Sequence, residues 1–379
     1  MEDGERIRKC LQCGTCSGVC PFGYFMKFPP SKIIGTLRAD IFDLVLKSDG
    51  VWMCVSCFAC TAFCPSQIPI TANLMTRVKE EMLIAGTVPT ELQVALANSQ
   101  RYGNPMGESP RKRADWISGI KPEVNLLGKT KKPVDVLWFV GDYASYHPRV
   151  QSATKALAKV LNALGVDFGI LGPEENSDGD SQRLAGERGL FEMLAEKNAK
   201  VFGKYQFNTI ITTDPHAYNA IKNEYPRLGI SFPVQHYTEY LVERIDQLKA
   251  LMNHEVKARV TFHDPCYLGR ANNVFDQPRA LLKTIAGLEL VEMAHNHTNS
   301  LCCGGGGGGM WLDGFQWEKA HVRLSDWRLR EAVSVDANIL AVACPYEAPR
   351  FEDAAKTMQG ADQLQVRDIA ELLAEAMGL

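Results

Sequence analysis

The twelve cysteines of this sequence fall into three groups of four, and their spacing indicates metal chemistry. Two groups share the pattern C-x2-C-x2-C-x3-C-P, and the third consists of a single cysteine, an adjacent pair and another single cysteine. Thiolates are soft ligands that select iron–sulfur clusters or zinc. Because no cysteine is left over, we expect every one to hold a metal. The groups are Cys10, Cys13, Cys16 and Cys20; Cys54, Cys57, Cys60 and Cys64; and Cys266, Cys302, Cys303 and Cys344.

The repeated pattern is typical of ferredoxins that bind two [4Fe–4S] clusters. In such proteins three cysteines of a run hold one cluster, and the fourth ligates the other cluster. A zinc site or a disulfide framework is the weaker alternative, because zinc prefers two C-x2-C pairs. We therefore expect a first cluster on Cys10, Cys13, Cys16 and Cys64, and a second cluster on Cys54, Cys57, Cys60 and Cys20.

The bulk composition is that of an ordinary globular chain with several domains. Of its 379 residues, 46% are hydrophobic and 22% are charged, and the length predicts two or three domains. The net charge of −3 provides no basic field for nucleic acid. No apolar run approaches the roughly 18 residues of a membrane span, and the first residues show no hydrophobic signal region. We therefore expect a cytoplasmic protein with reduced thiols and no transmembrane segment.

Helical periodicity surrounds the two cysteine runs. After two prolines, Ser31 is a candidate N-cap, and a helix is predicted up to a stop at Gly50. A second helix is predicted after Cys64, with its stop at Gly86. Helices around the cysteines favour an all-helical ferredoxin domain over residues 1–100. The apolar faces carry Ile34, Leu37, Ile41, Leu44 and Val45 in the first helix and Leu74, Val78 and Met82 in the second.

Residues 101–133 are predicted to form a linker, and the chain beyond them alternates between strands and helices. The linker is rich in glycine, proline and basic residues, and Arg111, Lys112 and Arg113 are expected to form a solvated patch. Strands are predicted at 134–140, 166–171 and 209–213, and a helix at 149–164. This alternation predicts a parallel α/β layer.

The second half of the α/β region repeats the first. Residues 139–143 align with 263–267, residues 177–179 with 302–304, and residues 208–217 with 338–347. The step from Asp142 to Ser177 in the first copy is 35 residues, and the matching step from Cys266 to Cys302 in the second copy is 36. The second copy then has a short insertion. Matched offsets predict two similar halves, residues 134–256 and 257–379.

The spacing of the third cysteine group carries a family resemblance. The motifs around these cysteines resemble the cysteine-rich CCG domain of iron–sulfur oxidoreductases. They are His263-Asp264-Pro265-Cys266, then Cys302-Cys303-Gly304, then Cys344-Pro345. When the two cysteine runs are included, the resemblance covers nearly the whole chain. The complete arrangement resembles the D subunit of heterodisulfide reductase. The chain is also similar to the D subunit of class II benzoyl-CoA reductase and to oxidoreductases linked to electron-transferring flavoproteins. The resemblance implies an α-helical ferredoxin domain followed by two Rossmann-like CCG halves.

The chain departs from this family in its cysteine count. A complete CCG copy carries five cysteines, whereas the second copy here keeps four and has Glu347 at the fifth position. The first copy keeps none and is expected to be a scaffold, with an aspartate metal site as the weaker alternative. We expect a third [4Fe–4S] cluster on Cys266, Cys302, Cys303 and Cys344, with a non-cubane cluster or structural zinc as the alternatives. The first copy has Asp142, Ser177, Asp178, Asp214 and Ala217 at these positions.

Other residues around the third group are candidates for supporting roles. Gly304 and Gly305 begin a run of six glycines whose amides can point at cluster sulfur atoms, and a flexible loop is the alternative. The candidate catalytic residues are His263, His295 and Glu347, with turn-forming or surface roles as the alternatives. Arg270 is expected either to bind an anionic group or to pair with a carboxylate.

The resemblance implies an iron–sulfur electron-transfer subunit, an oxidoreductase component of a multi-subunit anaerobic complex. Electrons would pass through the two ferredoxin sites to or from the CCG site. With one cysteine-bearing copy, the chain is not expected to reduce heterodisulfides, so a benzoyl-CoA reductase-type or flavoprotein-linked complex is the expected context. The expected partners are redox subunits: a flavoprotein, or a donor of ferredoxin or hydrogenase type. A closed electron relay without substrate chemistry, or structural zinc at the CCG site, is the alternative.

Overall fold

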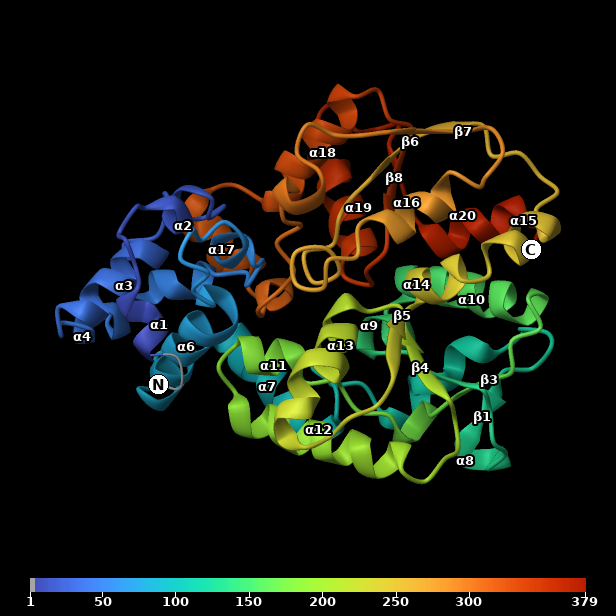
Figure 1. Ribbon diagram of the computed structural model, residues 1–379, viewed down its shortest axis with the longest axis horizontal. Helices are drawn as coiled ribbons and strands as arrows, with labels where there is room; N and C mark the ends of the chain where they lie inside the picture. Colours follow the sequence, from blue (N-terminus) through green and yellow to red (C-terminus); the bar gives the residue numbers. More distant parts are fainter. Residues whose placement is uncertain (1–3) are drawn as a thin grey trace.

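The computed structural model describes residues 4–379, which form a helical N-terminal part and two α/β halves (Figure 1). The helical part packs against one end of the two halves, and the halves lie one above the other (Figure 1). Within residues 4–379, no helix is both long and apolar enough to cross a bilayer.

The N-terminal part is helical, as predicted for a ferredoxin domain of this kind. Residues 4–102 contain helices and turns and, within this described range, no strand. Their core includes Ile33, Trp52 and Met82, each at most 1% exposed. The elements are α1 (Gly4–Arg8), α2 (Thr15–Gly18), α3 (Pro30–Arg38), α4 (Asp43–Leu46), η1 (Asp49–Met53), α5 (Ala59–Ala62), η2 (Ile70–Met75), α6 (Thr76–Ile84) and α7 (Thr90–Tyr102).

The first predicted helix is wrong in its length and in its N-cap. Pro29 is the N-cap of α3, while the Ser31 hydroxyl hydrogen-bonds the Ser17 hydroxyl at 2.7 Å. The helix ends at Arg38 because Asp40 takes a left-handed conformation (φ +57°). The second predicted helix is confirmed in α6, whose end is followed by Gly86 at φ +73°. The residues predicted for its apolar face, Leu74, Val78 and Met82, are all buried.

Residues 101–133 are folded against the first half, unlike the surface linker that composition predicted. They contain η3 (Pro110–Ile117), β1 (Asn125–Leu126) and α8 (Leu127–Thr130). Arg113 is only 2% exposed and pairs with Asp142 at 2.7 Å and with Glu175 at 2.8 Å. Only Arg111 and Lys112 of the expected basic patch are exposed.

The two halves have the same strand order, which confirms the repeat. The first sheet runs β1-β3-β2-β4-β5 and the second runs β7-β6-β8-β9, and every pair is parallel. Apart from β1, each half places its first strand between its second and third. The finer expectation of Rossmann-like halves stays a prediction. The remaining strands are β2 (Val136–Phe139), β3 (Phe168–Ile170), β4 (Thr209–Thr212), β5 (Val234–His236), β6 (Ala258–Phe262), β7 (Leu288–Val291), β8 (Ile339–Val342) and β9 (Gln365–Asp368).

Helices cover both sheets, and four of them lie between the halves. Helices α10, α14, α16 and α20 separate the two sheets (Figure 1) and share one hydrophobic core that includes Leu157, Leu241, Leu281 and Leu373. The helices of the first half are α9 (Asp142–Tyr146), α10 (Pro148–Ala163), α11 (Asp180–Leu184), α12 (Arg188–Phe202), α13 (Pro215–Asn219), α14 (Tyr237–Val242) and α15 (Ile245–Leu251). Those of the second half are α16 (Asp276–Leu282), α17 (Asp313–Ala320), α18 (Leu324–Ser334), α19 (Glu347–Thr357) and α20 (Ile369–Ala376).

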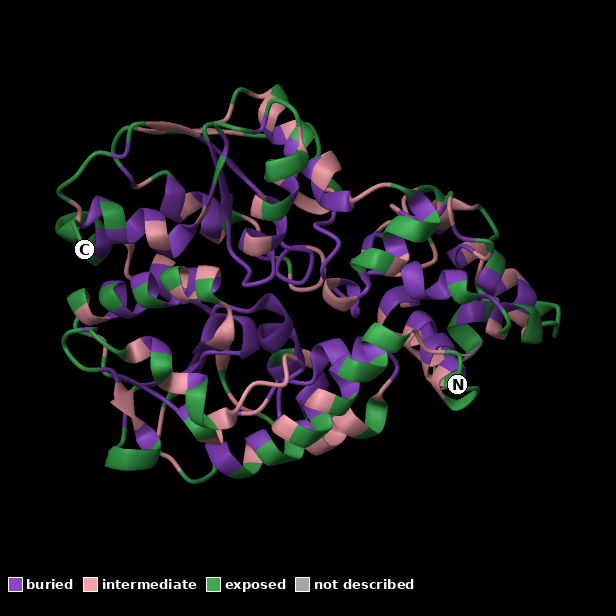
Figure 2. Ribbon diagram, turned by 180° about the vertical axis from the view of Figure 1, so that it is seen from behind, coloured by how far each residue is buried: buried purple, intermediate pink, exposed green. Residues whose placement is uncertain are grey.

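The repeat extends to the caps of equivalent helices. His236 caps α14 and Asp368 caps α20, and each forms a capping box with a glutamate three residues later. The Tyr237 hydroxyl also donates to Asp368 Oδ1 at 2.9 Å, which joins the two halves. The loops at the carboxyl ends of both sheets are buried where the halves face each other (Figure 2).

Candidate iron–sulfur centres

The structure brings together the two predicted sets of ferredoxin cysteines. Cys10, Cys13, Cys16 and Cys64 line one small cavity, which we call site I. Cys20, Cys54, Cys57 and Cys60 line a second cavity, site II. The fourth cysteine of each run therefore lies with the first three of the other run. None of the twelve cysteines, all within the described residues, forms a disulfide.

Both sites use the same local turn. Gly14 follows Cys13 at φ +80°, and Phe58 follows Cys57 at φ +64°. Each left-handed residue starts a one-turn helix, α2 or α5, and this helix carries the third cysteine of the run. A left-handed Phe is strained; the Phe58 ring packs edge-on against Tyr267 at 5.2 Å between centroids.

The electrostatics of site II fit a metal cluster. Burial raises the pKa of Cys20 well above its usual range, and Cys57, Cys54 and Cys60 raise it further. Several thiolates in one buried space repel one another, so their ionised forms need a compensating cation. Metal ions supply that charge and deprotonate the thiols that ligate them.

The last four cysteines meet at the carboxyl ends of neighbouring parallel strands, and we call this group site III. Cys266 follows β6, the adjacent pair lies in the loop after β7, and Cys344 follows β8. Ligands commonly bind at such strand ends, where loops of adjacent strands converge. The four cysteines are 4–8% exposed, and the thiols of Cys266 and Cys303 lie close enough to Cys302 to raise its pKa well above the usual range.

The six-glycine segment forms part of site III and is not a free loop. The amides of Gly304 and Gly305 donate to the sulfur atoms of Cys302 and Cys303, at 3.3 and 3.4 Å. The glycines that follow dock against the loop of site II: a Cβ atom at Gly307 would lie 2.4 Å from the Ser56 hydroxyl oxygen. All six glycines are buried.

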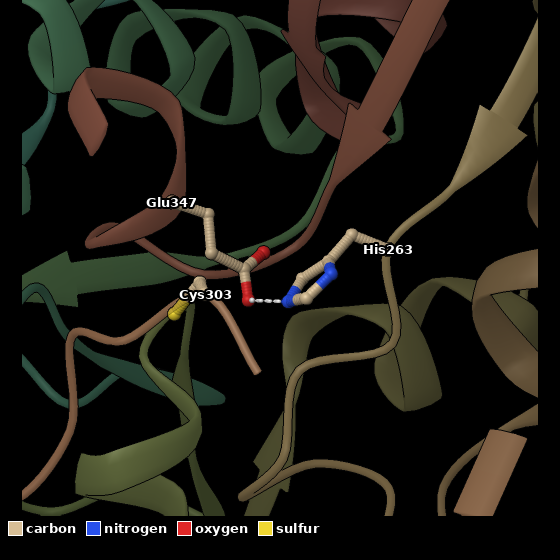
Figure 3. Close-up of side chains that lie close together, drawn as sticks. All are labelled: His263, Cys303 and Glu347. Carbon is tan, nitrogen blue, oxygen red and sulfur yellow. Dashed lines mark ion pairs between the residues drawn. The ribbon is translucent and has the colours of Figure 1, made fainter. Parts of the chain in front are cut away.

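His263, Cys303 and Glu347 converge at the edge of site III (Figure 3). His263 Nε2 lies 3.2 Å from Glu347 Oε1, and both side chains are 1% exposed. Arg328 Nε donates to His263 Nδ1 at 3.0 Å, so a neutral ring carries its proton on Nε2, which faces the carboxylate. Burial raises the pKa of Glu347 to about 7. Within residues 4–379, this is the one group of three such side chains whose ligand atoms all lie within 4.8 Å of one another.

The other candidates have different surroundings. His295 is exposed and pairs with Glu331, so the structure does not bring it to the cysteines. Arg270 forms no ion pair with a carboxylate among the described residues; its guanidinium donates to backbone carbonyls of Cys57, Thr298 and Ser300. The expected pairing with a carboxylate was therefore wrong, and the binding of an anionic group stays a prediction.

The equivalent positions of the first half are buried but have structural partners. Asp142 pairs with Arg113, Asp178 accepts from the amide of Asp180 at 2.8 Å, and Asp214 caps α13. Within residues 4–379, the oxygens of these three aspartates do not all lie within 4.8 Å of one another, as the ligand atoms of His263, Cys303 and Glu347 do. The first half thus has no thiols, and its carboxylates are engaged in the fold.

Two residues near the sites were missed in the sequence. Lys79 is fully buried and donates to the carbonyls of Cys54 and Gly307 at 2.8 and 3.0 Å. His216 stacks on Tyr267 with 4.0 Å between ring centroids, and its Nδ1 lies 2.9 Å from Asp180 Oδ2. The sequence did offer a signal for His216, which is its place in the repeat: it follows Asp214 and Pro215 directly. Lys79 carried no such signal.

The three sites form a contiguous series. Cys16 of site I lies close enough to Cys60 of site II to raise the pKa of that thiol, after the larger effect of burial. Cys57 of site II and Cys302 of site III lie in one buried cluster, close enough for each thiol to shift the pKa of the other. Site II is therefore the middle member, and site I, whose Cys13 is exposed, is the outer one.

The sequence matches two known domain families at these sites. Residues 136–222 and 260–346 each match the cysteine-rich CCG domain, and residues 6–68 match the 4Fe-4S dicluster domain. The chain carries two CCG domains and a 4Fe-4S dicluster domain. In this CCG-domain protein the two CCG matches coincide with the two α/β halves, and the dicluster match contains sites I and II.

Relatives of this CCG-domain protein are redox proteins by name. A probable iron-sulfur-binding oxidoreductase of Bacillus subtilis is 36% identical over 88% of this chain and 47% of its own length. An EtfAB:quinone oxidoreductase of Syntrophomonas wolfei is 34% identical with the same coverage. The D subunit of a heterodisulfide reductase of Methanosarcina mazei is 29% identical over 98% of this chain and 94% of its length. The chain spans about half the length of the first two relatives.

Proposed function

We propose that this protein is the iron–sulfur electron-transfer subunit of a larger oxidoreductase complex. The observation that carries the proposal is that Cys16 of site I, Cys57 of site II and Cys302 of site III lie in one buried cluster of packed side chains, which makes the three cysteine sites one continuous series. Iron–sulfur clusters held at these sites would supply one-electron transfer. The ligands would be the four cysteines of each site.

The exposed end of the series is the proposed entry or exit for electrons. Cys13 is exposed at site I, and the neighbouring Leu11 is 71% exposed. A redox partner could therefore approach site I closely. The relatives' names point to a flavoprotein as that partner, because one of them is an EtfAB:quinone oxidoreductase.

Site III is the proposed inner terminus, and heterodisulfide reduction is not its proposed reaction. The first half offers Asp142, Ser177, Asp178 and Asp214 where a second cysteine site would stand. A reaction that needs two facing cysteine-bound clusters therefore lacks one set of ligands here. A benzoyl-CoA reductase-type or flavoprotein-linked complex is the proposed context.

The burial of site III favours a second candidate, a closed relay. All four cysteines are at most 8% exposed, and His263, Glu347 and the glycine segment surround them. An enclosed site passes electrons onward without binding substrate. An EPR spectrum of site III that changes on addition of a thiol would support an open catalytic site, and an unchanged spectrum would support the relay.

A reductive titration of the anaerobically purified protein tests the main proposal. We expect it to take up about three electrons per chain, one for each cluster. We also expect the reduced protein to pass those electrons to an oxidised electron-transferring flavoprotein. Uptake of only about two electrons would contradict a redox-active site III.

A further inference from the structure

Arg270 lies between two of the three sites and bonds to both sides of their junction. Its Nε donates to the carbonyl of Cys57 in site II at 2.7 Å. Its Nη1 donates to the carbonyls of Thr298 and Ser300 at 3.2 and 2.6 Å, in the segment that leads into the Cys302–Cys303 pair. A single side chain of the second half thus fixes the ferredoxin loop against site III.

A second buried cation holds the other end of the same loop. Lys79 Nζ donates to the carbonyl of Cys54 at 2.8 Å and to that of Gly307 at 3.0 Å. The segment from Cys54 to Cys57 is therefore tied to the second half at both ends. Cys57, which shares a buried cluster with Cys302 of site III, lies at the Arg270 end.

Arg270 forms no direct ion pair with a carboxylate within residues 4–379, and its bonded partners are neutral carbonyls. Burial acts to lower the pKa of Arg270, but Cys57, Cys266 and Cys302 raise it above its usual range, which places the guanidinium beside thiols of both sites. Asp264 has a smaller effect in the same direction, and its carboxylate is paired with Arg279. Arginine stays charged in proteins, so this is a permanent positive charge.

We propose that Arg270 is a positioning residue that holds sites II and III together and favours the reduced state of both. This inference rests on the proposed function. Accepting one electron makes a site more negative by one charge, and a fixed cation at short range stabilises that charge state in a medium of low dielectric. Site I lies beyond site II, and within residues 4–379 its lining contains no arginine of the second half.

The test compares three variants of the full-length protein after anaerobic purification. Arg270→Gln removes the charge, and Arg270→Lys keeps it while losing the planar fork of donors. Arg38→Gln is the matched control, because Arg38 Nη1 donates to the carbonyl of Cys10 in site I at 2.9 Å and is exposed. Iron content is measured first, and then the midpoint potential of each site by EPR-monitored redox titration.

We expect Arg270→Gln to keep its iron and to shift the reduction equilibria of sites II and III about tenfold towards the oxidised form, or about 59 mV for a one-electron couple. Arg270→Lys should shift them much less, and Arg38→Gln should leave sites II and III unchanged. If Arg270→Gln loses iron, Arg270→Lys should still keep its iron and near wild-type potentials because it keeps the charge, and a shift of about tenfold in Arg270→Lys would overturn the inference.

Two results would overturn the inference. One is an unchanged potential at sites II and III in Arg270→Gln with full iron content. The other is a shift in Arg270→Lys as large as that in Arg270→Gln, since the charge would then have no role. Wild-type protein with fewer than three clusters would instead refute the proposed function, so the two failures are distinguishable.

Discussion

At the scale of single residues, site III depends on its backbone donors and on the second half's charged side chains. The amides of Gly304 and Gly305 donate to its sulfur atoms, and Arg350 Nε donates to the carbonyl of Cys303 at 2.8 Å. Hydrogen bonds of this kind tune the potential of a cluster. The sequence predicted the cysteine ligands and the glycine amides, whereas the contact of Arg350 required the fold to be known.

Replacing Cys303 by Ser should remove one cluster and leave sites I and II intact. The change takes one thiolate from site III, and a hydroxyl is a poor ligand for iron held by thiolates. EPR spectroscopy of the reduced protein should lose one of three signals. Asp178→Asn, at the equivalent position of the first half, is the control and should keep all three signals. Three persisting signals in Cys303→Ser would contradict the ligand set of site III.

Replacing Glu347 by Gln should raise the midpoint potential of site III. The carboxylate lies within 4.8 Å of the sulfur of Cys303, so its removal takes away a negative charge that opposes reduction. A redox titration of the variant measures the shift, and the exposed Glu289, changed to Gln, serves as the control. A lower or unchanged potential would show that Glu347 carries no charge at this site.

At the scale of elements, the strand ends position every residue of site III, and the repeat made this predictable. Cys266, Cys302–Cys303 and Cys344 follow β6, β7 and β8 just as their counterparts follow β2, β3 and β4. Local breaks were harder to predict. Periodicity favoured one helix from Ser31 to Gly50, but the left-handed Asp40 divides it, and Ile41 and Leu44 are 48% and 50% exposed. Composition likewise could not show that Arg113 is buried, because its partners lie 29 and 62 residues away.

The segment η3 should contribute strongly to stability through Arg113. Changing Arg113 to Met leaves the buried carboxylates of Asp142 and Glu175 without their cation, which costs about 3–5 kcal/mol. The exposed neighbour Arg111, changed to Met, should alter the free energy of unfolding by no more than about 0.5 kcal/mol. Denaturant unfolding of the two variants measures both. Equal stabilities would refute the buried network.

The cap of α20 should make stability depend on pH. Burial raises the pKa of Asp368 from 3.8 to about 7, so the folded state binds its proton more tightly than the unfolded state. The stabilisation is present at low pH and is lost as pH rises towards 7. Asn keeps the cap but cannot ionise. The melting temperature of Asp368→Asn relative to wild type should therefore be higher at pH 8 than at pH 5. The same difference at both pH values would contradict this assignment.

At the scale of the whole molecule, the ferredoxin part lies against the junction of the two halves and places its site II beside site III. The family resemblance predicted the parts and their order along the chain. It did not predict that Lys79 and Arg270 bind them together, because these contacts join residues 228 and 213 positions apart. The repeat also predicted two similar halves, and the first proves to contribute buried carboxylates and His216 rather than thiols.

Counting metal in anaerobically purified protein tests the central claim, that three cysteine sites hold three iron–sulfur clusters in series. The account predicts about twelve iron and twelve sulfide per chain with no zinc, since each [4Fe–4S] cluster contributes four of each. About eight iron with one zinc would contradict it, because site III would then be a structural zinc site and the series would end at site II.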